Sequence, residues 1–118
     1  MNFILVFIGG GLGAVARYGV AKLVPSSTAG FPYPTFIANF ISCVILGYLL
    51  GLIAQGQIDD KAKLLLATGF CGGFSTFSTF SAETLSLIQN GQMGLATIYI
   101  GVSIVVCLIA VFIGLKLV

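Results

Sequence analysis

Four long apolar stretches make up most of the chain, and short polar segments separate them. The pattern predicts helices at about 2–24, 35–54, 62–89 and 93–117, with a first loop rich in proline and serine at 25–34. An α-helix needs about 20 apolar residues to cross a hydrocarbon core about 30 Å thick, and each stretch is close to that length or longer. We therefore predict an all-α membrane protein, a single domain with four transmembrane helices.

The third stretch contains residues that disfavour a continuous helix. Gly69, Gly72 and Gly73 precede a run at 75–81 in which serine and threonine alternate with phenylalanine, and both glycine and hydroxyl side chains weaken helices. In hydrocarbon, a backbone N–H or C=O group that a break sets free is costly unless protein or a wet cavity satisfies it. Membrane helices usually break at mid-depth where they handle a solute. We therefore predict a functional break near 72–76.

Isolated polar side chains lie inside the second and fourth stretches. Asn39 has Ser42 three residues later, and an amide in a membrane helix either bonds a neighbouring helix or serves as a ligand. For Asn39 taken alone, the bond to a neighbouring helix is the simpler interpretation. Tyr99, Ser103 and Cys107 are spaced four and four, so they share one helix face. Together with the hydroxyls of the third stretch, these groups favour a path for a polar solute.

Two basic residues lie toward the end of the first stretch. Lys22 suits snorkelling of its ammonium group to the membrane interface. Arg17 lies about a turn deeper, so it either snorkels as well or holds a carbonyl, a partner helix or an anion. No basic residue precedes the apolar run, so we expect this stretch to remain as a helix rather than to be cleaved as a signal peptide.

Glycines recur four residues apart in three of the stretches. Small residues at this spacing let membrane helices approach closely, and we expect them to supply packing surfaces within or between chains. The pairs are Gly9 and Gly13, Gly47 and Gly51, and Gly69 and Gly73.

The composition excludes several classes of protein. The chain is 58% hydrophobic and 7% charged, whereas soluble domains have about 25% charged residues. A net charge of +2 without a basic run does not suit a nucleic-acid partner. The chain has no histidine, and Cys43, Cys71 and Cys107 lie far apart in apolar segments, where they fit small packing residues. Nucleophilic catalysis and metal binding by side chains lack their usual residues, so we do not expect an enzyme.

The basic residues give a weak preference for one orientation in the membrane. Four helices would put both termini on one side, and that side has three basic side chains against two on the other (Lys61, Lys63 and Lys116 against Arg17 and Lys22). A chain with so small a bias can insert both ways. One four-helix chain has little room to enclose a path, so we predict that two oppositely inserted copies pair about an axis in the membrane plane.

Three motifs resemble those of a known family. With GGGLGAVARY in the first stretch, Asn39 in the second and GFCGGFSTFSTFSAE in the third, the sequence is similar to the CrcB/Fluc family of fluoride channels over its whole length. The resemblance implies an antiparallel, dual-topology homodimer in the inner (plasma) membrane. It also implies that fluoride leaves the cell passively through two pores per dimer, each lined by both subunits.

The resemblance further implies roles for single residues. The backbone carbonyls of Gly72 and Ser75 would hold a structural Na⁺ at the dimer centre, although the family often has threonine at position 75. The fluoride pathway would consist of one amide, two aromatic rings and several hydroxyls, at Asn39, Phe77, Phe80, Ser78, Thr79, Tyr99 and Ser103. Arg17 and Glu83 lie in matching motifs, where they would have accessory roles.

The chemistry of these side chains suits a fluoride path. Fluoride is small and strongly hydrated, so a pore must replace its water with hydrogen-bond donors such as amide N–H and hydroxyl groups. Phe77 and Phe80 are three residues apart on one helix face, and the positive edges of their rings can face an anion. Neutral donors release the ion more readily than a buried cation would, and conduction requires release.

Two other functions fit parts of the pattern. A small multidrug-type, proton-coupled antiporter is also short, four-helical and able to insert both ways, and Glu83, the only acid within the apolar stretches, would be its titrating group. Such an antiporter usually carries its acid early in the chain, and the first stretch has none. The other alternative is a membrane assembly subunit that transports nothing.

Overall fold

The computed structural model describes residues 1–24 and 30–118, and the described part of the chain consists of helices and short connections, without strands. Residues 25–29 of the predicted first loop lie outside it. The elements are α1 (Asn2–Leu23), α2 (Tyr33–Ala54), α3 (Asp60–Ala62), the π-helix η1 (Lys63–Cys71), α4 (Gly72–Phe74), α5 (Phe77–Gln89) and α6 (Met93–Lys116).

Within the described residues, three helices, α1, α2 and α6, are long and apolar enough to cross a membrane. The third predicted stretch instead contains four consecutive elements, α3, η1, α4 and α5. Helix α2 begins at Tyr33, two residues before the predicted start, with Pro34 in its first turn. Proline is tolerated there because the first N–H groups of a helix have no partner within the helix.

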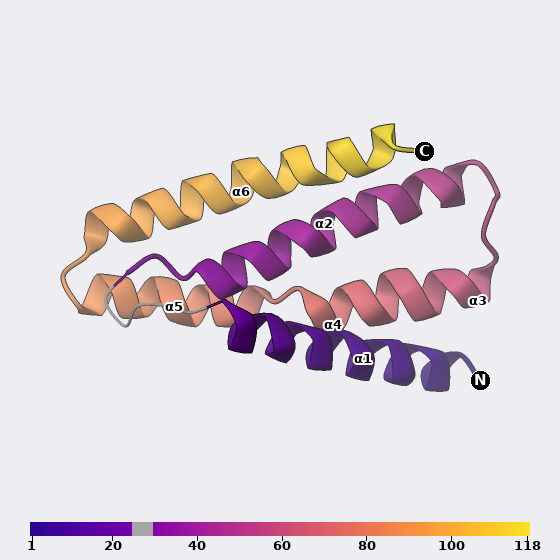
Figure 1. Cartoon of the computed structure of the whole chain (residues 1–118), viewed down its shortest axis with the longest axis horizontal. Helices are drawn as coiled ribbons and strands as arrows, with labels where there is room; N and C mark the ends of the chain where they lie inside the picture. The colour runs from indigo at the N-terminus through magenta and orange to yellow at the C-terminus, as the bar shows by residue number, and fades with distance from the viewer. Residues whose placement is uncertain (25–29) are drawn as a thin grey trace.

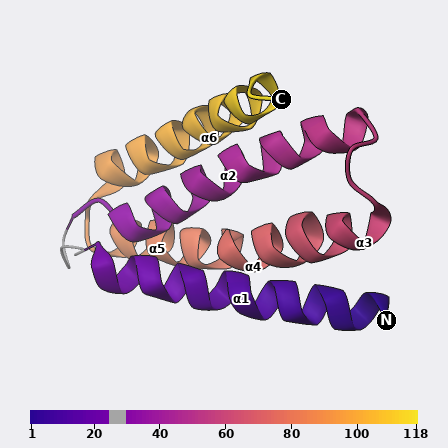
Figure 2. The same cartoon turned by 45° about the vertical axis from the view of Figure 1, so that its right-hand side comes forward.

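The helices lie side by side in a flattened bundle that measures 48 × 28 × 21 Å (Figure 1). Their order across the bundle is α6, α2, the run from α3 to α5, and α1, and two views agree on it (Figures 1 and 2). Helix α1 packs along η1 and α4, α2 packs along α6, and α5 also contacts α6. Both termini lie at the same end of the bundle (Figure 1).

Two of the predicted glycine pairs pack against each other. A Cβ atom at Gly9 would overlap the carbonyl oxygen of Leu65 and meet the Cα atom of Gly69, and one at Gly73 would overlap the backbone of Gly10. The absence of side chains therefore allows the backbones of α1 and η1–α4 to touch. These surfaces are occupied within one chain, so contacts between chains must use others.

The contact between α2 and α6 is built in the same way. A Cβ atom at Gly47 would overlap the carbonyl oxygen of Val111, and one at Gly114 would overlap that of Val44. Gly114 belongs to none of the glycine pairs in the sequence pattern. A spacing rule within one helix does not reveal a single glycine that packs against another helix.

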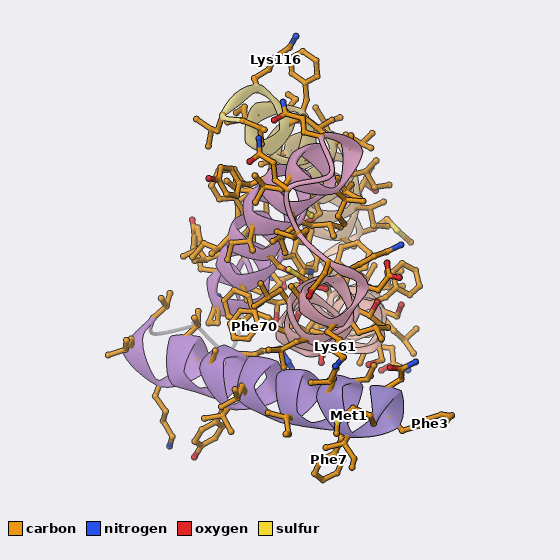
Figure 3. The ribbon with its side chains drawn as sticks, turned by 90° about the vertical axis from the view of Figure 1, so that its right-hand side faces the viewer. Met1, Phe3, Phe7, Lys61, Phe70 and Lys116 are labelled. Carbon is orange, nitrogen blue, oxygen red and sulfur yellow. The ribbon has the colours of Figure 1, made fainter. Side chains whose placement is uncertain are left out.

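Large apolar side chains cover the outside of the bundle. Phe3 and Phe7 of α1 point away from the other helices (Figure 3), with 92% and 81% of their surface exposed. The buried cluster of the described residues is small and surrounds Tyr99, with Leu87 and Ala96. Large apolar side chains outside and a small buried cluster inside are expected for a bundle surrounded by lipid, where apolar side chains gain little from being buried between helices.

Candidate functional site

The helical run is interrupted between α4 and α5. Ser75 and Thr76 have extended backbones, with ψ angles of 157° and 123°. Their side chains explain the local geometry: the Ser75 hydroxyl donates to the carbonyl oxygen of Cys71 at 2.8 Å, and the Thr76 hydroxyl caps α5 by accepting from the N–H of Thr79 at 3.2 Å. Serine and threonine thus compete with the helical hydrogen bonds and then start a new helix.

Side chains of α1 and α2 satisfy the backbone at the break. Asn39 accepts a hydrogen bond from the N–H of Thr76 at 2.9 Å through Oδ1, and its Nδ2 donates to the carbonyl of the same residue at 3.4 Å. Arg17 donates through Nε to the carbonyl oxygen of Gly73 at 3.2 Å. Of the alternatives open for these two residues, the structure therefore has Asn39 bonded to a neighbouring element and Arg17 holding a carbonyl.

Two carbonyls at the break lose the donors that a continuous helix would supply. In such a helix, the N–H of Thr76 would bond the carbonyl of Gly72, and the N–H of Thr79 would bond that of Ser75. The first donates to Asn39 instead, and the second donates to the Thr76 hydroxyl. Gly72 is exposed, and a Cβ atom there would meet nothing within 4 Å. Carbonyls of unwound membrane helices are Na⁺ ligands, so the donor set fits this ion.

A cavity of about 250 Å³ lies beside the break, which we call cavity 1. The hydroxyl of Ser103, a residue only 7% exposed, has no hydrogen-bond partner in the described part of the chain. The rings of Phe77 and Phe80 have centroids 5.7 Å apart, and Phe77 is 79% exposed. The lining residues are Asn39, Cys43, Ser75, Thr76, Phe77, Phe80, Ser103, Ile104 and Cys107.

The carboxylate of Glu83 receives two hydroxyl hydrogen bonds from different helices. Tyr99 donates to one carboxylate oxygen and Thr35 to the other, each at 2.9 Å. Tyr99 is fully buried, and its ring packs edge-on against Phe31 and beside Phe80. Its hydroxyl is therefore directed at Glu83, and the ring of Phe80 is the part of this cluster that also lines cavity 1.

A second cavity, cavity 2, of about 390 Å³, is lined by Thr35 and Glu83 of this cluster. Arg17 and Glu83 both line it, so the cavity carries one basic and one acidic group. The complete lining is Ala14, Arg17, Tyr18, Ala21, Pro34, Thr35, Thr79 and Glu83.

The structure thus distributes the residues predicted from sequence over several places. Four of the pathway residues line cavity 1: Asn39, Phe77, Phe80 and Ser103. Thr79 lines cavity 2 and Tyr99 is buried between the helices, whereas Ser78 is exposed at the surface with its hydroxyl 3.2 Å from that of Thr76.

Sequence reasoning missed two residues that hold the site together. Thr35 bonds Glu83, and Thr76 both caps α5 and pairs with Asn39. Thr76 carried a local signal, because a threonine followed by a helix is a common N-cap. Thr35 carried none, because its partner lies 48 positions away in the sequence.

Residues 1–24 and 30–118 contain no group of three or more histidine, cysteine, aspartate or glutamate side chains that could hold a metal ion. Any cation at the break would therefore rely on backbone oxygens.

Comparison with known proteins gives a consistent set of relatives. A family model described as "CrcB-like protein, Camphor Resistance (CrcB)" matches residues 4–115. A protein of Pyrococcus abyssi is 45% identical over 94% of this chain and 90% of its own length. A protein of Pyrococcus furiosus is 46% identical over 96% of this chain and 92% of its own length. A protein of Thermus thermophilus is 41% identical over 98% of this chain and 94% of its own length. Each of the three is named fluoride-specific ion channel FluC.

Proposed function

The chain belongs to the CrcB-like family, and from that premise we propose that it is a fluoride-selective channel through which fluoride leaves the cell passively. The family consists of ion channels and not of enzymes, and with its three apolar helices the chain is a multi-pass protein of the plasma membrane. The names of its relatives support fluoride as the ion.

The observation that carries the proposal is the donor set of cavity 1. Ser103 presents a buried hydroxyl that has no hydrogen-bond partner among residues 1–24 and 30–118, and an unpaired polar group of this kind is costly unless something binds it. Asn39 lies in the same lining, and the edges of Phe77 and Phe80 offer positive partial charge to an anion. The lining contains no charged side chain, so an ion would be held by neutral groups that can also release it.

We also propose that the working unit is an antiparallel homodimer with two pores. A largely exposed Phe77 and an exposed Gly72 place the break at the surface of the single chain, where a second copy would cover it. Pairing of oppositely inserted copies is a recurrent plan of membrane transport proteins, with the site where broken helices meet. Cavity 1 would then be completed by the partner chain.

A structural Na⁺ is proposed for the centre of that dimer. The carbonyls of Gly72 and Ser75 would hold it, because the N–H groups that a helix would aim at them are bonded elsewhere. The ion would supply positive charge that keeps these oxygens of two chains together. Within one chain, Asn39 and Arg17 keep the break in this conformation.

Efflux from liposomes tests the function. Purified protein in liposomes loaded with potassium fluoride should release fluoride to an electrode when valinomycin is added, and chloride-loaded liposomes should release almost nothing. No fluoride release would contradict the proposal and favour a non-transporting subunit. Release that requires a proton gradient and stops in Glu83→Gln would instead favour the proton-coupled antiporter, because a channel keeps passive flux.

A further inference from the structure

Helices α2 and α6 run in the same direction and pack along each other (Figures 1 and 2). The tight contact between Gly47 and Val111 joins positions 64 apart in the sequence. One helical turn earlier, the same offset pairs Cys43 with Cys107. The glycine contact brings the helix axes close together, so these two side chains meet.

The two thiols are neighbours in the lining of cavity 1. Cys43 and Cys107 are within interaction range of each other, and both are half-buried and line the cavity. Cys71, the third cysteine, is buried and does not belong to the lining. The cavity is therefore lined by a pair of thiols from two helices, together with the Ser103 hydroxyl, which has no hydrogen-bond partner in the part of the chain that the structure describes.

We propose that Cys43 and Cys107 bind a soft, two-coordinate metal ion such as Cu⁺, Ag⁺ or Hg²⁺ between their sulfur atoms. Thiolate sulfur selects soft metals. The described residues supply no group of three histidine, cysteine or acidic ligands, so the tetrahedral set of a structural zinc site is not met here. Binding forms two metal–sulfur bonds and releases the two thiol protons to solvent, so no oxidant or reductant is needed.

Occupancy of this site has a consequence that rests on the proposed function. The metal would lie in the same cavity as Asn39, Phe80 and Ser103, where its bulk would obstruct the proposed fluoride path. Fluoride flux should therefore fall when the metal binds.

Mercury binding to the reduced protein in liposomes tests the site directly. Hg²⁺ should bind once per chain, give the ultraviolet absorbance of a mercury–thiolate bond, and remove two of the three thiols from reaction with a maleimide. The variants Cys43→Ser and Cys107→Ser should each lose this absorbance. Cys71→Ser is the matched control and should keep it. Retention of the signal in both of the first two variants, or its loss in the control, would overturn the proposal.

A measurement on the unmodified chain does not depend on how the variants fold. Phenylarsine oxide binds two adjacent thiols, and it should protect the wild-type protein from the maleimide until a competing dithiol removes it. Absence of protection would overturn the metal site. The site would also be overturned, in favour of a disulfide, if two thiols failed to react with the maleimide before any metal was added and reacted after treatment with dithiothreitol. Because neither readout uses fluoride, mercury binding without a fall in flux would contradict only the obstruction.

Discussion

Asn39 bonds the N–H and the carbonyl of one residue, Thr76, and so takes the place of a backbone partner at the break. Asn39→Asp keeps an acceptor for the N–H but removes the donor to the carbonyl and adds a negative charge beside the proposed anion path. We expect fluoride flux to fall by about tenfold or more, since an unpaired buried polar group alone costs about 1–3 kcal/mol and about 1.4 kcal/mol is tenfold in rate. Liposome efflux measures it.

Ser42→Ala is the matched control for this change. Ser42 donates to the carbonyl of Cys71, which also accepts from the N–H and the hydroxyl of Ser75, so its loss leaves that carbonyl paired. Flux in this variant should stay close to that of the wild type. Unchanged flux in Asn39→Asp would leave Asn39 with a purely structural role.

Phe80 connects cavity 1 to the buried cluster around Tyr99. Phe80→Ile keeps most of the bulk but removes the ring edge, so flux should fall while the protein remains folded in detergent. Phe7→Ile is the control, because Phe7 points away from the bundle (Figure 3) and its replacement should change neither property. Wild-type flux in Phe80→Ile would exclude the ring from the path.

The contacts of single polar side chains could not be predicted from the sequence. Spacing predicts that Tyr99 and Ser103 share a helix face, but it does not say what each group contacts. In the structure the Tyr99 hydroxyl bonds Glu83, whereas Ser103 lines cavity 1. That difference depends on α5 packing beside α6, which no local pattern encodes.

At the scale of elements, close helix packing depends on single glycines. Gly114→Ala would place a Cβ atom against the backbone of Val44 and Tyr48, so α2 and α6 would have to separate. Overpacking of this kind usually costs about 1–3 kcal/mol, and we expect a lower midpoint of thermal unfolding in detergent. Gly101→Ala in the same helix meets nothing within 4 Å and should not lower the midpoint. Equal midpoints would contradict the tight contact.

The elements differ in how far the sequence could predict them. Long apolar runs give α1, α2 and α6 a clear signal, because a helix of that length in lipid must satisfy its own backbone. The composition of the third stretch indicated a break near 72–76, and the structure has Ser75 and Thr76 outside the helices. Nothing in the composition indicated the π-helix from Lys63 to Cys71, which closes its turns with one extra residue while it packs against α1.

At the scale of the whole molecule, both termini and the second loop lie at one end of the bundle, with Lys61 and Lys116 (Figure 3). The antiparallel dimer requires that chains insert in both orientations. Added positive charge at one end should remove one of them, because lysine and arginine near short loops determine orientation. Gln55→Lys with Gln57→Lys should hold the termini in the cytoplasm, and Gln89→Lys with Asn90→Lys should hold them outside.

Each biased chain alone should give little fluoride flux, because all its copies point the same way and cannot form the antiparallel pair. The two biased chains expressed together should restore flux, since each then supplies the orientation that the other lacks. Reporter fusions at the C-terminus establish the orientations. The double variant Gln55→Asn with Gln57→Asn changes the same loop positions without adding charge, so it should keep both orientations. Full flux from one chain in a single orientation would rule out the antiparallel dimer, because cavity 1 would then work without an inverted partner.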